Sequence, residues 1–574
     1  MDESPHKGKT GLERLWRAFG YSAEGLGAAL KNEDAFRQEL ILAVILIPVA
    51  WFCHVPGFAK AVMIASVMLV LIVELLNSAI EAVVDRISLE NHQLAKRAKD
   101  MGQRGGVAVA GECRDRLVRR ADFEVTAGCL HHEHFFQGPS MNTCDVVVIG
   151  GGPAGSTVAA LLAQQGRHVV LLEKEHHPRF HIGESLLPLN LPLLDQLGVR
   201  AEIEKIGMLK YGAEFVSPYH NKSYTYEFAD ALDKSYPYSY QVRRSEFDHV
   251  LIKNAAQRGA QIFEGHRVTS VDFVDDANVT VGAQTKDGEV RQWRARFLVD
   301  ASGRDTFLAD KFGIKRKNPK HNSAALYGHF EGAKRHSGNA EGNISLYWFD
   351  HGWFWFIPLH DGTTSVGAVC WPYYMKSRKT NPTQFFLDTI ALSPSLAERL
   401  KDARLISPAT ATGNYSYKAQ RMMGKNYIML GDAFAFIDPV FSTGVYLAMD
   451  SAFVGAEAVA TCLARPAEAG RALRQFDKRI RSGLDTFSWF IYRLTAPSLR
   501  DLFIAPSNPL RVQEGVLSLL AGDIFRKEIG LAPKLAIFKV IYYVVNLLNV
   551  KRSYAAWRRR EQIIRDPQTD GATT

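Results

Sequence analysis

The chain has 574 residues, of which 47% are hydrophobic and 22% charged, a composition that excludes a mainly disordered or fibrous protein and fits several globular domains. Its 69 Lys and Arg residues exceed its 60 Asp and Glu residues by 9, a mild excess that suits an anionic membrane surface or acidic partner but does not indicate a nucleic-acid binder. The six cysteines are scattered without a CxxC pair, which excludes a disulfide framework and favours a reducing compartment.

The first apolar segments predict a transmembrane helical hairpin. Residues 1–37 are polar and basic and show no signal peptide. Residues 40–59 contain no Lys, Arg, Asp or Glu, and a second apolar segment covers residues 61–84. Basic residues precede the first segment and follow the second, so the positive-inside rule places both ends in the cytoplasm. We expect spans at about 40–56 and 61–84.

Polar side chains interrupt the second span on one helix face. Glu74, Asn77, Glu81 and Asp85 are spaced by 3, 4 and 4 residues. Ionisable groups at membrane depth are costly and usually functional, and paired carboxylates suit a divalent metal and a nucleotide phosphate. A polar seam between helices is the alternative interpretation.

Residues 10–102 resemble the prokaryotic integral-membrane diacylglycerol kinases in the runs GYSAEGL (20–26), NEDAFRQE (32–39), VELLNSAIEAVVDR (73–86) and RAKDMG (97–102). The resemblance implies the bacterial inner membrane, a lipid bilayer as partner and an oligomer formed through the membrane region. It implies six site residues: Glu74 as general base, Glu33 and Glu81 as Mg²⁺ ligands, and Asn77, Lys99 and Asp100 at the nucleotide. That family has a third transmembrane helix, whereas residues 103–140 contain no apolar run of spanning length, so we expect impaired kinase activity.

Residues 103–140 are predicted to be a junction. The cluster of Cys129, His131, His132, Glu133 and His134 is a weak metal-site candidate, because no second ligand pair stands at structural-zinc spacing nearby. Two interpretations stay open: a linker, or a kinase reading frame running out of register into a gene that begins at Met141.

Residues 141–510 are predicted to form a flavoprotein. A strand at 145–149 runs into the loop GGGPAG (150–155), followed by a helix at 156–165, a strand at 168–172 and the acid Glu173. In this order, Gly150, Gly152 and Gly155 allow a tight turn and close approach of a pyrophosphate at the helix N-terminus. Glu173 would accept a hydrogen bond from a ribose hydroxyl.

Three later motifs resemble those of the FAD-dependent monooxygenases. They are QVRRSEFD (241–248) with Arg244, FLVDASGR (297–304) with Asp300 and Gly303, and YIMLGDA (427–433) with Asp432, which the resemblance places at the ribityl chain of FAD. The implied fold class is α/β: a Rossmann-like FAD-binding domain of the glutathione-reductase and hydroxylase type, a β-sheet substrate domain and a helical C-terminal region, preceded by the all-α hairpin.

Three further motifs resemble the flavin-dependent halogenases. They are WFWFIP (353–358), HIGESLLP (181–188) and KYGAEF (210–215). By resemblance, Trp353, Trp355, Ile357 and Pro358 line a tunnel, and Lys210 is catalytic. Taken singly, the aromatic motif also fits a core strand and the lysine a solvated surface charge. A plain FAD monooxygenase or oxidoreductase is therefore the alternative function, and a membrane diacylglycerol kinase is the second alternative.

The halogenase resemblance implies reduced FAD, a halide ion and a separate flavin reductase. The halide would lie at the backbone amides of Thr443 and Gly444, and Lys210 would hold hypohalous acid by hydrogen bond or as a haloamine. Phe441 stands where tryptophan halogenases carry a glutamate, which resembles the phenol and pyrrole halogenases. We expect an electron-rich aromatic substrate, such as a phenol, a pyrrole or an aryl-polyene-like ring, free or tethered to a carrier protein.

The tail, residues 511–574, is predicted to be mainly helical. Its apolar stretch VIYYVVNLLNV (540–550) is too short to span a membrane comfortably. A helix that covers the core is the favoured interpretation, and an interfacial contact is the alternative.

Overall fold

The computed structural model describes residues 142–565, except 276, 319–320, 322, 414–415, 507 and 525–530, and, nearer the N-terminus, residues 36–37, 40, 43–44 and 47–48. The chain divides into two compact units, residues 1–135 and 136–574. The few described residues of the first unit are helical. Most of the first predicted span, the whole second span and the 129–134 cluster lie outside the described residues. So do the kinase-like site residues Glu33, Glu74, Asn77, Glu81, Lys99 and Asp100.

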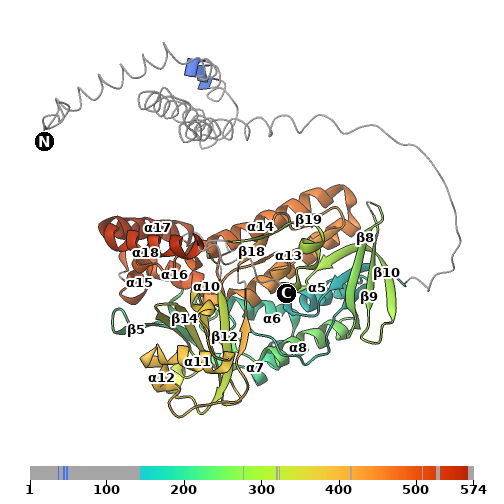
Figure 1. The fold of residues 1–574 in the computed structure, drawn as a ribbon. Coiled ribbons are helices and arrows are strands. Elements are labelled where there is room, and N and C mark those ends of the chain that lie inside the picture. Colours follow the sequence, from blue (N-terminus) through green and yellow to red (C-terminus); the bar gives the residue numbers. More distant parts are fainter. Residues whose placement is uncertain are drawn as a thin grey trace, which may run out of the picture. The chain divides into compact units, whose positions relative to one another are not determined.

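The first sheet of the second unit has the strand order β19-β20-β10-β1-β2-β7, and β8 and β9 extend it beside β10 (Figure 1). Its strands are β1 (Asn142–Ile149), β2 (Val169–Leu172), β7 (Gln261–Phe263), β8 (Arg267–Phe273), β9 (Val279–Gln284), β10 (Val290–Asp300), β19 (Met423–Gly424) and β20 (Tyr427–Met429). The five strands from β20 to β7 are parallel. Parallel strands covered on both faces read as continuous apolar runs, as residues 146–149 do.

Helices around the nucleotide loop pack beside this sheet: α5 (Pro153–Gln164), α8 (Arg244–Gln257) and α13 (Thr443–Ala464). The predicted strand, glycine loop, helix and second strand are confirmed, with bounds that differ by one to three residues. The helix starts earlier than predicted because Pro153, with its fixed φ, occupies the first turn.

The second sheet has the order β16-β12-β15-β14-β13-β4-β5, with β17 paired to β12. Its strands are β4 (Gly212–Ser217), β5 (Lys222–Glu227), β12 (Ala324–Glu331), β13 (Ile344–Phe349), β14 (Gly352–Pro358), β15 (Thr363–Cys370), β16 (Arg404–Leu405) and β17 (Thr410–Thr412). Strand β14 is buried on both faces: Trp353, Trp355 and Ile357 join the main core, and Phe354 and Phe356 join a second core under the outer helices.

Two small sheets and several short helices accompany the two large sheets. The pair β3 (Met208–Lys210) and β6 (Ser239–Gln241) forms one small sheet, and β11 (Lys315–Lys317), β18 (Tyr417–Ala419) and β21 (Ala435–Phe436) form another. The smaller helices are α6 (Leu191–Leu197), α7 (Arg200–Ile206), α9 (Phe307–Lys311), α10 (Pro372–Lys376), α11 (Pro382–Ala391) and α12 (Pro394–Arg399).

The C-terminal helices complete the main core. They are α14 (Ala469–Ile491), α15 (Pro497–Ile504), α16 (Val512–Leu520), α17 (Leu531–Leu548) and α18 (Val550–Arg565). The predicted helical tail is therefore confirmed for its described residues, and one side of α17 covers the core as expected. Among the described residues, α13 and α17 are the two helices long and apolar enough to cross a membrane. Helix α13 is mostly buried in the core, whereas only 22% of α17 is buried.

Candidate active site

The glycine loop after β1 is shaped by close backbone contacts. Gly150 has φ +98°, and a Cβ there would lie 2.5 Å from the carbonyl oxygen of Ala301. A Cβ on Gly155 would lie 1.9 Å from the carbonyl oxygen of Gly150. At Gly152, a Cβ would meet only the Arg179 guanidinium, at 3.7 Å. The first and third glycines therefore permit the turn, and the second leaves the start of α5 open.

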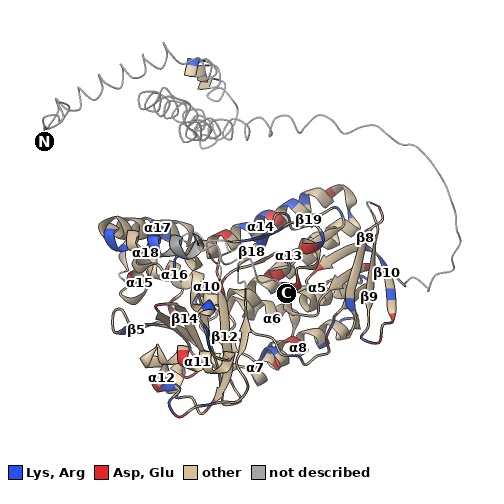
Figure 2. Ribbon diagram, in the orientation of Figure 1, with Lys and Arg blue, Asp and Glu red and all other residues tan. Residues whose placement is uncertain are grey.

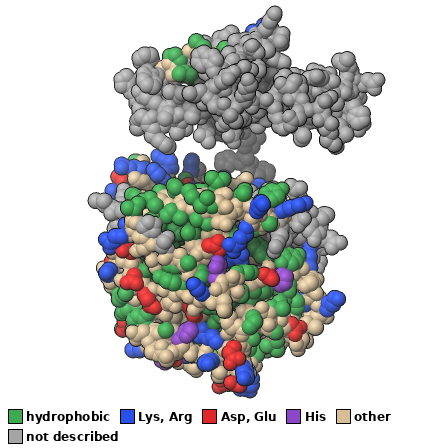
Figure 3. Space-filling view, turned by 90° about the vertical axis from the view of Figure 1, so that its left-hand side faces the viewer, with side chains coloured by type: hydrophobic (Ala, Val, Ile, Leu, Met, Phe, Trp, Pro, Cys, Tyr) green, Lys and Arg blue, Asp and Glu red, His purple; other side chains and the backbone are tan. Residues whose placement is uncertain are grey.

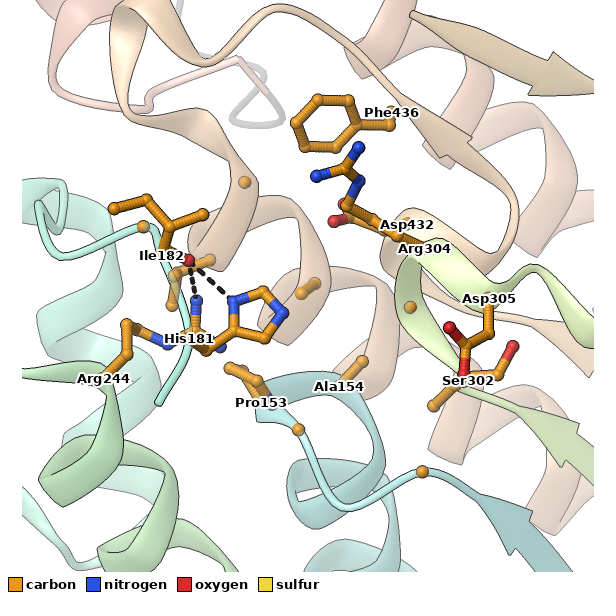
Figure 4. Close-up of a pocket in the computed structure, with 18 of the residues that line it drawn as sticks. Pro153, Ala154, His181, Ile182, Arg244, Ser302, Arg304, Asp305, Asp432 and Phe436 are labelled. Atoms are coloured by element: carbon orange, nitrogen blue, oxygen red, sulfur yellow. Dashed lines mark hydrogen bonds between the residues drawn. The ribbon is translucent and has the colours of Figure 1, made fainter. Parts of the chain in front are cut away.

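The start of α5 is suited to an anion. No side chain caps it, and its first residue is Pro153, which has no N–H. The remaining first-turn N–H groups carry the partial positive charge of the helix N-terminus. Gly152 and Pro153 both line a cavity of about 520 Å³ (Figure 4), within the usual range for a cofactor site.

Glu173 follows β2 at the edge of this cavity. Its buried carboxylate accepts hydrogen bonds from the backbone N–H groups of Gly151 (2.6 Å) and Glu175 (2.9 Å). The Arg179 guanidinium lies 3.7 Å from the same carboxylate. The acid predicted to meet the ribose thus also fixes the glycine loop, which is a link that the motif does not reveal.

The cavity joins most of the predicted site residues. Those that line it are Gly150, Gly152, Glu173, Arg244, Gly303, Trp353, Trp355, Ile357, Asp432 and Gly444. Those that do not line it are Gly155, Lys210, Asp300, Pro358 and Thr443.

Asp300 lies behind the cavity wall. Its carboxylate accepts from the backbone N–H groups of Ser302 (2.9 Å) and Leu308 (2.8 Å) and is fully buried, and burial raises its pKa. The geometry therefore gives Asp300 the task of shaping the turn that brings Ser302 and Gly303 to the cavity.

Arg244 is held on two sides. It makes a two-pronged pair with Asp248, at 2.8 and 3.0 Å, and donates to the carbonyl of Ile182 at 2.9 Å. His181 donates to the same carbonyl through Nδ1, at 2.7 Å, and faces the cavity (Figure 4). Burial, with the Arg244 charge beside it, lowers the pKa of His181 to about 4. Sequence reasoning missed His181, although it opens the HIGESLLP motif.

Asp432 and Arg304 line the side of the cavity across from His181 (Figure 4). Burial raises the pKa of Asp432 to about 6, while Arg304 and Arg244 act in the other direction. The Arg304 guanidinium lies 5.5 Å from the ring centroid of Phe436, and both residues line the cavity. Sequence reasoning predicted Asp432 but missed Arg304 and Phe436. Arg304 ends the FLVDASGR run, which was the available signal.

The residues that line the cavity fit FAD. An open helix N-terminus, a carboxylate at the end of the second parallel strand and a second carboxylate before a long helix are the groups that a dinucleotide needs. The residues to hold it would be Gly152, Glu173, His181, Arg304 and Asp432. The described part of the chain contains no cluster of His, Cys, Asp and Glu that could hold a metal ion.

An aromatic wall closes one part of the cavity. Trp353 and Trp355 lie side by side on β14, with ring centroids 6.1 Å apart. The Trp355 indole N–H donates to the Ser365 hydroxyl at 3.2 Å. A Cβ on Gly367 would lie 2.2 Å from the Trp355 ring, so β15 has a glycine where the indole needs space. Three alternate residues of the predicted tunnel motif therefore face the cavity, and Pro358 does not.

Lys210 lies at the end of β3 and is 1% exposed. Its ammonium nitrogen donates to the Ser185 hydroxyl (2.9 Å) and the Leu186 carbonyl (3.1 Å), and lies 5.2 Å from the ring centroid of Phe228. Burial lowers the pKa of Lys210 to about 7. Ser185 lines the cavity, so one side chain separates the lysine from it.

The start of α13 lies on the same cavity. Ser442 has φ +57°, which turns the chain sharply into the helix, and Gly444 lines the cavity. The buried Thr443 hydroxyl has no hydrogen-bond partner among the described residues. Phe441 points away, with its ring parallel to Phe503 and the centroids 6.2 Å apart.

A buried hydrogen bond that the sequence did not predict lies beside this region. The Glu184 carboxyl group and His329 Nε2 are hydrogen-bonded at 2.9 Å, and both side chains are at least nine-tenths buried. Glu184 lines the cavity directly before Ser185. The pair joins the 181–188 loop to β12, which helps to fix the hydroxyl that holds Lys210.

Two family models match the chain. Residues 20–110 match the prokaryotic diacylglycerol kinase model, and residues 143–477 match the FAD binding domain model. A 1H-pyrrole-2-carbonyl-[peptidyl-carrier protein] chlorinase of Pseudomonas fluorescens is 30% identical over 406 residues, which cover 66% of this chain and 89% of that protein.

Two further similarities extend this result. A tryptophan 2-halogenase of Chondromyces crocatus is 34% identical over 330 residues, covering 56% of this chain and 61% of that protein. The solved structure of the myxobacterial chondrochloren halogenase, described as a variant of FAD-dependent halogenases, has a TM-score of 0.60 and 33% identity. That similarity covers 68% of this chain and 92% of the solved one.

Proposed function

Because the chain belongs to the flavin-dependent halogenases, we propose that its second unit uses reduced FAD, oxygen and a halide to halogenate a pyrrole or phenol ring through Lys210. One observation carries the proposal. The cavity that fits FAD is lined by the indoles of Trp353 and Trp355 and by Ser185, and a fully buried lysine lies behind Ser185. A hydroxylase would need the ring to reach the flavin, which this wall opposes.

The start of α13 supplies a place for the halide. The backbone N–H groups of Thr443 and Gly444 are at a helix N-terminus, where the helix dipole favours an anion. When bound, reduced FAD with oxygen supplies the oxidising power that converts halide to hypohalous acid. The aromatic wall of the cavity would keep the acceptor ring away from the flavin. It would also keep water away from the hypohalous acid.

Lys210 then passes the halogen on. At neutral pH a substantial fraction of its amine is unprotonated, because burial lowers its pKa to about 7. The neutral amine can attack hypohalous acid to give a haloamine and water, or the protonated form can donate a hydrogen bond that polarises the bound acid. In either case an electron-rich ring takes the halogen and loses a proton.

The ring class follows from Phe441 and the relatives. Phe441 packs on Phe503 and offers no carboxylate at the start of α13, so the ring must be reactive without that help. The pyrrole chlorinase acts on a carrier-bound pyrrole, which supports a pyrrole or phenol, free or carrier-tethered. The tryptophan 2-halogenase keeps indole among the rings to test. A separate flavin reductase is the expected source of reduced flavin.

Product mass decides between the candidate activities. The full chain is supplied with flavin, a flavin reductase, and a pyrrole-2-carbonyl carrier thioester, a phenol or tryptophan, with chloride or bromide. We expect the halogen isotope pattern to follow the halide supplied. A hydroxylated product that forms equally without halide would identify a monooxygenase instead.

We also propose that the first unit anchors the chain in the inner membrane, so that the second unit lies on the cytoplasmic side. We expect the first unit to have little kinase activity. The match to the diacylglycerol kinase model supports the membrane part of this proposal. The lack of a third apolar run in residues 103–140 supports the loss of activity.

A further inference from the structure

Helix α17 has two apolar faces, and the described residues of the chain cover only one of them. Leu531, Leu535, Phe538 and Tyr542 are buried against the core. On the opposite side, residues 540, 543, 544, 547 and 548 are exposed and are spaced as one helical stripe. The outermost side chains, Leu547 and Leu548, are 75% and 78% exposed.

This stripe continues onto α18 and forms a concentrated patch. The patch consists of Val540, Tyr543, Val544, Leu547, Leu548, Val550 and Tyr554. These seven are among the eighteen large hydrophobic residues exposed in the described part of the chain, although they span only fifteen positions. Figure 3 faces this end of the unit and shows hydrophobic side chains gathered there with Lys and Arg around them. Such a contiguous patch marks an interaction surface.

The sequence of α17 and α18 is strongly basic. Residues 531–565 contain eight Lys and Arg residues and one acid, Glu561, and Figure 2 shows the basic residues along α17 and α18. Arg552 pairs with Asp501, at 2.8 Å, whereas Lys551 and Arg558 are exposed at the surface. A second copy of this chain would bring like charges together, which disfavours a symmetric dimer through the patch.

Aromatic and basic side chains alternate at the edge of the patch. The Trp489 ring lies 5.3 Å from Tyr542 and 6.2 Å from Tyr543, centroid to centroid. The Lys539 ammonium lies 5.2 Å, and the Arg493 guanidinium 4.6 Å, from the Trp489 ring centroid. Trp, Tyr and basic residues beside an aliphatic stripe are the composition of a helix that lies at a membrane–water interface.

We propose that the α17–α18 surface binds an anionic lipid bilayer, with α17 lying in the interface. It would not span the membrane, because its inner face packs on the core and Lys539 lies in its first half. Basic residues near an anionic leaflet each add to binding, and the apolar stripe enters the headgroup region. A membrane span in the first unit would raise the local lipid concentration, so this contact need not be strong alone.

Hydrogen exchange on the full chain tests this proposal. The protein is reconstituted in vesicles of phosphatidylcholine alone or of phosphatidylcholine with about a third phosphatidylglycerol, so that the first unit inserts in both. We expect several-fold slower exchange in peptides from 531–565 in the anionic vesicles, reduced by high salt, with no change in peptides from 382–399.

Matched variants separate this surface from the rest of the chain. L547E with L548E should abolish the slowing, and K551E should weaken it without touching the apolar stripe. L392E, at a position 50% exposed elsewhere, should leave it intact. FAD absorbance reports that each variant is folded, and halogenation of a water-soluble ring should not change, so failure here leaves the proposed activity standing.

Three outcomes would overturn the proposal. One is exchange that does not depend on lipid charge. Another is protection in detergent that rises with protein concentration, which would mean a second copy. The third is protection by an acidic carrier protein without lipid, which would make the patch a protein-docking surface.

Discussion

At the scale of single residues, Lys210 combines deep burial with the need to react. Its amine is held by one hydroxyl and one carbonyl, and no carboxylate lies among its hydrogen-bond partners. Because burying the ammonium charge costs free energy, the pKa of Lys210 is lowered to about 7, close to neutral pH. A lysine paired with a carboxylate would be equally buried but would stay protonated.

The variant Lys210→Met should abolish halogenation but keep FAD and its reoxidation. It should also be more stable than the wild type at neutral pH. The folded-state pKa of about 7 lies below the unfolded value of 10.5, so the wild type loses stability as pH falls from about 10.5 to about 7. After allowing for the two lost hydrogen bonds, the gain should be ~2 kcal/mol at pH 7.

Denaturant unfolding at pH 7 and pH 10, with product mass on the same samples, checks both parts. The stability difference should shrink at the higher pH, because the wild-type lysine then approaches neutrality in the unfolded chain as well. Undiminished halogenation would remove Lys210 from the mechanism, and a variant without flavin absorbance would point to a structural role.

At the scale of elements, β14 and β15 build the aromatic wall together. β14 alternates between two cores, so its odd-numbered residues from 353 to 357 reach the cavity. The antiparallel partner of Trp355 is Gly367, which leaves the space that the indole occupies. The wall is thus a property of two strands and not of the motif alone.

Gly367→Ala should displace the Trp355 indole and open the wall. The added methyl would lie 2.2 Å from the ring, an overpacking that typically costs about 1–3 kcal/mol. We expect less halogenated product per flavin oxidised, measured by product mass against oxygen uptake. Gly413→Ala, where a Cβ meets nothing within 4 Å, is the control. Unchanged coupling and stability would show that the wall does not separate the two steps.

The elements around the nucleotide loop were predictable because their signals are local. Buried parallel strands, the glycine loop and the helix lie within thirty residues of one another, from 145 to 172. The second sheet was not predictable in detail, because β4 pairs with β13 across more than a hundred residues. For the same reason the motifs identified Asp432 and Lys210, but not the contacts that Arg304 and Glu184 make with distant segments.

At the scale of the whole molecule, the chain joins two compact units, residues 1–135 and 136–574. Each flavin-site element described above lies in residues 136–574. The membrane expectation for residues 1–102 rests on the apolar segments and on the match to the kinase model. The two activities can therefore be tested separately.

A chain from Met141 to Thr574 should fold, bind FAD and halogenate with a separate flavin reductase. The reason is that its core closes without the first unit: residues 136–574 form one compact unit. Flavin absorbance, thermal unfolding and product mass are the measurements. A colourless or insoluble product, beside a yellow and active full chain, would mean that residues 1–140 contribute to the fold.

The full chain should have its C-terminal unit in the cytoplasm and show negligible lipid kinase activity. Two spans return the chain to the side on which it began, and the basic residues after residue 84 agree with this. Without a third helix, Glu74 and Glu81 would lack part of the wall that keeps them dry and positioned. Protease should therefore cut the flavin unit on sealed inverted vesicles. Protection there, or phosphatidate formation from ATP that Glu74→Gln removes, would contradict these expectations.

The two indoles on the cavity wall should also limit the lifetime of the active enzyme. Indole is itself an electron-rich ring, so hypohalous acid that finds no acceptor meets Trp353 and Trp355 before anything outside. We therefore expect turnover without an acceptor to halogenate these indoles, so that inactivation follows the number of turnovers and not the time elapsed. Peptide mass spectra after turnover without substrate should show halogen on these two residues first. The supply of acceptor substrate would then set both the yield of halogenated product and the working lifetime of the enzyme.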